Sequence, residues 1–109
     1  MWAVNGAKTV WREEYNFRIE VAATLAVLLA AWWLNFNMGE VVVLVFCILL
    51  VLSSEIVNTA IEDVCNKINP EHDPIIGKIK DTMAAFVLLN VGGAAVIGTI
   101  VFARHFGFI

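Results

Sequence analysis

Charged residues, proline and cysteine are all scarce in this chain of 109 residues. Charged side chains make up 16% of the residues and hydrophobic ones 61%, whereas a soluble domain is about 45–50% apolar. A soluble domain of this size has too little interior to bury so much apolar surface, so we expect lipid to cover part of it. The few basic residues form no stripe, and the sequence therefore does not predict nucleic-acid binding.

The chain also lacks the common signatures of nucleotide and metal sites. It has neither a Walker loop nor the glycine-rich loop of protein kinases, so any nucleotide site must be of another kind. Its 2 cysteines lack metal-ligand spacing. We expect Cys47 to behave as a small hydrophobe and Cys65 to stay reduced. The N-terminus does not predict a signal peptide, because charged residues precede the first apolar block and no small-residue cleavage pattern follows it.

Three apolar blocks, separated by turn residues and by two prolines, predict a single all-α membrane domain over residues 1–109. An open strand in lipid leaves backbone groups without partners, so each block is predicted to be a helix. We expect a surface helix first and three transmembrane helices after it. Their expected bounds are about 2–18 for the amphipathic surface helix and about 19–36, 41–68 and 76–103 for the spans.

The basic residues are unevenly placed around these blocks. Six of the seven precede the first span or flank the loop between the second and third: Lys8, Arg12, Arg18, Lys67, Lys78 and Lys80. Cytoplasmic loops of membrane proteins carry an excess of Lys and Arg. We therefore expect the N-terminus and the second loop to be cytoplasmic and the C-terminus to lie outside.

Polar residues interrupt the second apolar block along one helical face. Their spacing of i, i+3, i+4 and i+7 aligns Glu55, Asn58, Thr59 and Glu62. A charged residue inside a span costs roughly 2.5–3.5 kcal/mol on insertion scales, so Glu55 predicts a functional site. The alternative for Asn58 is hydrogen bonding between helices, and for Glu62 it is a simple interfacial location.

Several of these charges suit phosphoryl transfer at the cytoplasmic face. Mg²⁺ is commonly held by one or two carboxylates together with phosphate oxygens, a role that fits Glu14 and Glu62. Lys80 could neutralise phosphate charge, and the deeper Glu55 could accept the proton of a lipid hydroxyl. The simpler alternatives are that Glu14 is a solvated surface charge and that Lys80 only reaches the interface.

Three segments of the sequence carry a family resemblance. They are Glu14-Tyr-Asn-Phe-Arg-Ile-Glu20 before the first span, Glu55-Ile-Val-Asn58-Thr-Ala-Ile-Glu62 in the second, and Lys78-Ile-Lys80-Asp81 before the third. In this order and spacing they resemble the motifs of the prokaryotic diacylglycerol kinase/undecaprenol kinase family, which are small membrane lipid kinases. The resemblance covers nearly the whole chain, about residues 5–103.

The resemblance implies a homotrimer in the bacterial inner membrane, with active sites between neighbouring subunits. It implies that ATP, with Mg²⁺, phosphorylates the hydroxyl of undecaprenol or diacylglycerol. Glu55 would be the general base, and Glu14 and Glu62 would be the metal ligands. The ATP-binding positions implied are Glu14, Asn58, Glu62, Glu71, His72, Asp73, Lys80 and Asp81. The lipid-binding positions implied are Asn16, Phe17, Arg18, Glu20, Glu55 and Ala84.

One position departs from the family pattern, and other functions stay open. Four residues after Glu62 the family has Asp, whereas this chain has Asn66, so we expect weaker contact with nucleotide or metal there. The segments around Asn16 and His72 look more like the undecaprenol kinase branch than the diacylglycerol branch. The alternatives are a proton-relay or transporter subunit, with Glu55 and Glu62 as protonation sites, and a degenerate homologue that binds nucleotide without turnover.

Overall fold

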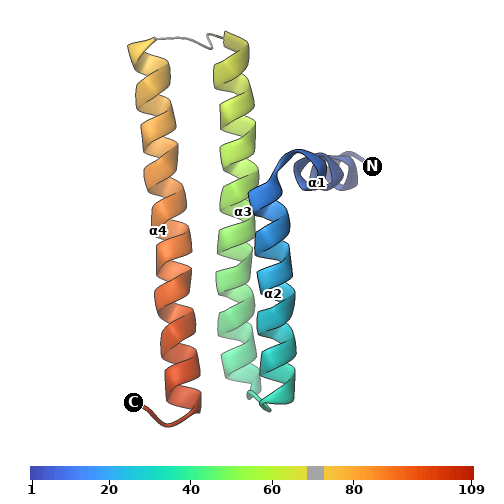
Figure 1. Ribbon diagram of the computed structural model, residues 1–109, viewed down its shortest axis with the longest axis vertical. Helices are drawn as coiled ribbons and strands as arrows, with labels where there is room; N and C mark the ends of the chain where they lie inside the picture. Colours follow the sequence, from blue (N-terminus) through green and yellow to red (C-terminus); the bar gives the residue numbers. More distant parts are fainter. Residues whose placement is uncertain (69–72) are drawn as a thin grey trace.

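The computed structural model describes residues 1–68 and 73–109, which form four helices (Figure 1). These are α1 (Trp2–Glu13), α2 (Tyr15–Trp33), α3 (Met38–Ile68) and α4 (Pro74–His105). No strand occurs among the described residues. Three of the helices, α2, α3 and α4, are long and apolar enough to cross a membrane. The prediction of an all-α membrane protein with three spans and a further N-terminal helix is confirmed.

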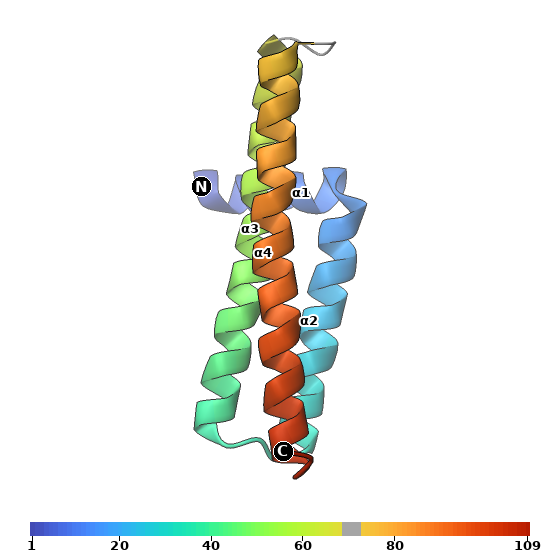
Figure 2. The same cartoon turned by 90° about the vertical axis from the view of Figure 1, so that its left-hand side faces the viewer.

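The two longest helices, α3 and α4, lie side by side and antiparallel, and α2 packs against one half of α3 (Figures 1 and 2). α3 has 31 residues, whereas α2 has 19. At 1.5 Å per residue α3 is about 46 Å long, which exceeds the hydrocarbon thickness of about 30 Å. The α3–α4 pair therefore extends beyond α2 at the end that carries its connecting loop. We call this the loop end, and the opposite end, where α2 turns into α3, the turn end.

The N-terminal helix does not continue into α2, because the chain bends at Glu14. This residue has extended backbone angles, φ −111° and ψ 104°, between the two helices. α1 consequently lies across the long axis of the bundle (Figure 2) and ends at Glu13 rather than near residue 18. Trp2 and Trp11 on α1 are exposed, as expected for a helix that rests its apolar face in the headgroup layer.

The third helix begins at Met38 rather than near residue 41, because Asn37 caps it. Asn37 Oδ1 accepts a hydrogen bond from the backbone N of Glu40 at 2.9 Å, and Glu40 Oε1 accepts one from the backbone N of Asn37 at 2.9 Å. This reciprocal pair is a capping box. It draws into the helix residues that the sequence alone had suggested for a turn.

Few side chains are buried between the helices, since most of the large apolar ones are exposed. The buried apolar residues are Val10, Phe17, Ala31, Leu44, Cys47, Cys65, Ile76 and Ala94. The many exposed Leu, Val, Ile and Phe side chains on α2, α3 and α4 suit helices covered by lipid or by other helices. Between these three helices lies an apolar groove of about 680 Å³, lined from Glu20 in α2 to Phe106 and Phe108 after α4.

Candidate functional site

Acidic side chains from three segments gather beside one face of α3. Glu14 lies at the α1–α2 bend, Glu20 in α2, and Glu55 and Glu62 in α3. Glu55 is buried, with 9% of its surface exposed. Each of the other three carboxyl groups is close enough to Glu55 to repel it when both are charged. We call these residues the acidic cluster.

The bend at Glu14 and the helical spacing of α3 build the cluster. Glu55 and Glu62 lie two turns apart on one helical face, and Asn58 between them donates from Nδ2 to Glu62 Oε1 at 3.3 Å. Thr59 Oγ1 donates to the backbone oxygen of Glu55 at 2.9 Å. The Thr59 hydroxyl is therefore satisfied within its own helix, whereas Asn58 orients an acidic side chain.

Glu20 has a carboxyl oxygen that the protein leaves without a partner. Its Oε2 is buried, and no residue described by the structure offers it a hydrogen bond. Native proteins pair nearly all buried polar atoms, and leaving one unpaired costs about 1–3 kcal/mol. Glu20 also lines the apolar groove. A hydrogen-bond donor on a bound molecule would therefore be favourable at the end of the groove where Glu20 lies.

The lysine expected to meet phosphate lies at the loop end. Lys80 is exposed, and its Nζ donates to Asn66 Oδ1 at 3.2 Å, which links α4 to α3. Asp81 beside it is also exposed. Both side chains thus lie on the part of α3 and α4 that extends beyond α2, where water-soluble molecules have access.

The structure describes only part of the segment that precedes α4. Asp73 Oδ1 accepts hydrogen bonds from the backbone N of Ile75 at 2.8 Å and of Ile76 at 3.3 Å, so its carboxylate caps the helix. The expected positions Glu71 and His72 lie outside the described residues. Asp73 therefore has a structural role beside any contact with nucleotide.

The expected lipid-side residues occupy the start of α2 and the outer surface of α4. Phe17 is buried, whereas Asn16, Arg18 and Ala84 are exposed. The guanidinium of Arg18 lies 5.7 Å from the centre of the Tyr15 ring, within the range of a cation–π contact. Asn16, Arg18 and Ala84 thus remain available to molecules outside the chain.

Oxygen ligands suitable for Mg²⁺ are present, but they do not form a complete cage. The described residues contain no group of three or more His, Cys, Asp or Glu side chains placed to hold a metal ion. Glu14 and Glu62 each lie near Glu55, and Mg²⁺ often takes one or two carboxylates and completes its shell with phosphate oxygens and water. The oxygen chemistry of Glu14 and Glu62 therefore fits an ion that takes its remaining ligands from phosphate and water.

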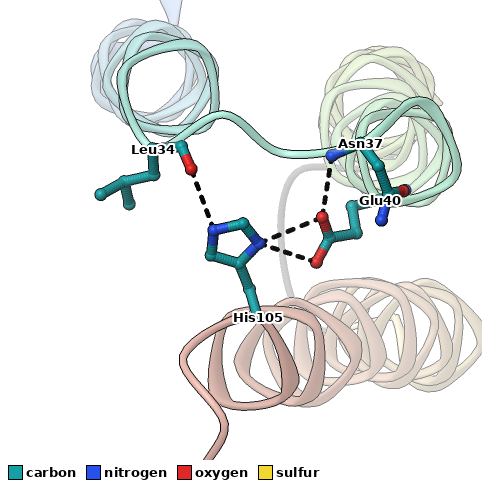
Figure 3. Close-up of polar contacts among 4 residues, drawn as sticks. All are labelled: Leu34, Asn37, Glu40 and His105. Atoms are coloured by element: carbon teal, nitrogen blue, oxygen red, sulfur yellow. Dashed lines mark hydrogen bonds and ion pairs between the residues drawn. The ribbon is translucent and has the colours of Figure 1, made fainter.

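Sequence reasoning missed a second polar cluster, at the turn end (Figure 3). His105 Nδ1 lies 3.1 Å from both carboxylate oxygens of Glu40, and its Nε2 lies 2.9 Å from the backbone oxygen of Leu34. The Phe36 ring stacks on the His105 ring at 4.1 Å. An Asn-x-x-Glu capping signal at 37–40 was the one local clue. The contacts with His105 depend on how α4 packs against the turn.

Both ring nitrogens of His105 face oxygen acceptors. A neutral imidazole carries one N–H, so one of these contacts would lack a proton, whereas the protonated ring donates to both sides. The contacts are therefore complete only for the charged ring beside the Glu40 carboxylate. This arrangement joins α2, α3 and α4 and leaves Glu40 with donors on two sides.

The fold is that of a small helical membrane protein with three candidate membrane-spanning helices and a cluster of acidic side chains beside α3. A simple anchor has no use for a buried carboxyl group near other acids, and ionisable residues inside membrane spans commonly belong to functional sites. α3 and α4 extend beyond α1 and α2 at the loop end (Figure 1).

The chain belongs to the prokaryotic diacylglycerol kinase family, whose model matches residues 1–102. It is 34% identical over 102 residues to a diacylglycerol kinase of Escherichia coli K12, covering 94% of this chain and 84% of the relative. It is 29% identical over 102 residues to an undecaprenol kinase of Bacillus subtilis 168, covering 91% and 83% respectively. The protein is therefore a lipid kinase, and the family predicted from the sequence is confirmed.

Proposed function

We propose that the protein transfers the γ-phosphate of ATP, with Mg²⁺, to the hydroxyl of a membrane lipid, either undecaprenol or diacylglycerol. The observation that carries the proposal is the burial of Glu55 between Glu14, Glu20 and Glu62. A buried carboxylate at the boundary between lipid and water can meet a lipid hydroxyl from one side and a nucleotide from the other. Membership of a lipid kinase family supports this chemistry.

Glu55 is the general base in this proposal. It accepts the proton of the lipid hydroxyl while the hydroxyl oxygen bonds to the γ-phosphorus. The bond between the γ-phosphorus and the β–γ bridging oxygen breaks, which yields the lipid phosphate and ADP. Glu14 and Glu62 would be the residues that hold Mg²⁺, and the bound ion would supply positive charge to offset that of the phosphates. Asn58 supports this role by fixing the Glu62 carboxylate.

The nucleotide occupies the loop end in this proposal. Lys80 offers a positive charge to the phosphates, and its exposure on the extended part of α4 supports access. The further nucleotide contacts proposed from the family resemblance are Glu71, His72, Asp73 and Asp81. The excess of basic residues near the N-terminus and the α3–α4 loop supports a cytoplasmic location of both segments, in the bacterial inner membrane.

The lipid occupies the opposite side of the acidic cluster. Its hydroxyl meets Glu55, and Glu20, whose Oε2 needs a donor, lies at the head of the apolar groove that suits the hydrocarbon chains. Asn16, Phe17, Arg18 and Ala84 complete the lipid side by family resemblance. The homotrimer, with sites between neighbouring subunits, is proposed from the family resemblance, and the exposed apolar faces leave surface on which such neighbours could pack.

The identity of the lipid is tested with the purified protein in vesicles. Motif details favour undecaprenol, while the relatives have 34% identity for a diacylglycerol kinase and 29% for an undecaprenol kinase. Vesicles containing one lipid or the other, with radiolabelled ATP and Mg²⁺, should yield a labelled lipid phosphate from at least one. Absence of label from both would contradict the proposal. Proton flux without ATP would instead favour a transporter function.

A further inference from the structure

One contact at the loop end pairs a cation with a neutral acceptor. Lys80 Nζ donates to Asn66 Oδ1 at 3.2 Å, between residues 14 apart in sequence and on different helices. A lysine ammonium can only donate hydrogen bonds, so the Asn66 amide must present its oxygen. Among residues 1–68 and 73–109, no carboxylate forms an ion pair with Lys80. The amide therefore orients the ammonium group without adding a negative charge beside it.

The neutrality of this acceptor matters because Lys80 lies where phosphates are expected. A carboxylate at position 66 would attract the ammonium group more strongly and offset its charge. An incoming phosphate would then compete with that carboxylate for the same donor. With Asn66, the lysine side chain is restrained and its charge stays available. A side chain that is already restrained loses less conformational entropy when a ligand binds, which favours binding.

We propose that Asn66 is a positioning residue, which holds Lys80 for the phosphates of ATP while leaving its charge uncompensated. This inference rests on the proposed function, since it assigns Lys80 to the nucleotide. It replaces the expectation that an amide at this position weakens contact with nucleotide. The difference arises because the observed partner of Asn66 is Lys80 itself.

The direct test compares Asn66→Asp with the unchanged protein. We expect the KM for ATP to rise about fivefold, the range of an exposed ion pair, while kcat changes by less than about twofold. Equilibrium binding of ATP with Mg²⁺ should weaken by the same factor. Raising the salt concentration should shrink the difference, because salt screens exposed charges. Asn66→Leu should also raise the KM, since it removes the hydrogen bond, but without this dependence on salt.

Two controls separate the effect from a general change in charge. Lys67→Gln changes the net charge by the same amount at the neighbouring exposed position, and it should leave the affinity for ATP nearly unchanged. In a Lys80→Met background, Asn66→Asp should produce no further change, because the two residues act as one unit.

The outcomes distinguish this inference from the proposed function. Equal or tighter ATP binding by Asn66→Asp would overturn the inference, and so would the same weakening in the Lys80→Met background. If no lipid is phosphorylated while ATP binding follows the expected pattern, the proposed function fails and the positioning role stands. Absence of ATP binding by the unchanged protein would overturn both.

Discussion

At the turn end of the bundle, Glu40 accepts hydrogen bonds from the Asn37 backbone and from His105, whose other nitrogen meets the backbone oxygen of Leu34 (Figure 3). In the acidic cluster, by contrast, carboxyl groups lie near one another, and Glu20 Oε2 has no hydrogen-bond partner among the described residues. Both regions place acids on helices that are otherwise largely apolar. Among the described residues, Glu40 at the turn end has donors for its carboxylate oxygens, whereas in the acidic cluster Glu62 is paired and Glu20 Oε2 is not.

This difference distinguishes acids that stabilise the fold from acids whose partner would be a bound ligand. A paired carboxylate joins three helices and stabilises them, and nothing about it requires another molecule. Unpaired acids near a buried carboxyl group destabilise the isolated protein, and such groups persist at sites where a substrate or ion completes them. The comparison therefore predicts opposite consequences for mutations in the two regions.

The largest expected effect concerns Glu55. Replacing it with Gln keeps the shape and removes the base, so turnover should fall by about 10²- to 10⁴-fold. ATP binding, measured at equilibrium with Mg²⁺, should change little because the triphosphate lies toward Glu14 and Glu62. The opposite result would be a variant that binds ATP weakly but turns over at the normal rate once ATP is bound. That result would show that Glu55 contacts the nucleotide instead.

A smaller effect is expected from Glu14→Gln and Glu62→Gln. Each variant loses one metal ligand, so the Mg²⁺ concentration needed for half-maximal turnover should rise about tenfold or more. The neighbouring acids offer matched controls, since Glu13→Gln and Asp63→Asn remove equal charge from exposed positions outside the cluster. Activity titrations with Mg²⁺ check this. A shift of similar size in the controls would mean that general surface charge, and not coordination, sets the requirement.

The smallest effect on activity is expected at the turn end. His105→Phe keeps the stacking on Phe36 and removes both polar contacts, which should destabilise the fold by about 1–2 kcal/mol. Turnover at a temperature well below unfolding should stay within about twofold of the unchanged protein, since the site lies toward the opposite end. Thermal unfolding in detergent micelles measures the first effect. Unchanged stability would argue that the polar contacts at the turn contribute nothing net.

Most of the fold and part of the site could be predicted from the sequence. Long charge-free blocks specify helices in lipid, and helical spacing aligns Glu55 with Glu62 without any tertiary information. Glu14, in another segment, was suggested by the carboxylate chemistry of Mg²⁺ sites, and the family resemblance added Glu20. Helix ends were less accurate: the surface helix stops at Glu13 because the backbone bends, and α3 begins early because of a capping box.

The missed contacts depend on packing between helices. Glu40 and His105 are 65 residues apart, and Lys80 and Asn66 are 14 apart on different helices. Neither pair follows a helical period, so no local pattern could reveal it. Each pair depends on the register of α4 against α3, which is set by many weak apolar contacts and not by a motif.

The central claim is that Glu40 at the turn end is structural, whereas the acidic cluster is functional. Comparing Glu20→Gln with Glu40→Gln tests it most directly. Both changes replace a carboxyl group by an amide of the same shape. We measure the thermal unfolding midpoint and the rate of lipid phosphorylation of each purified variant. The account predicts that Glu40→Gln unfolds at lower temperature yet stays active, while Glu20→Gln is as stable as the unchanged protein or more so and loses most activity. Loss of stability by Glu20→Gln with activity retained, or loss of activity by a folded Glu40→Gln, would contradict it.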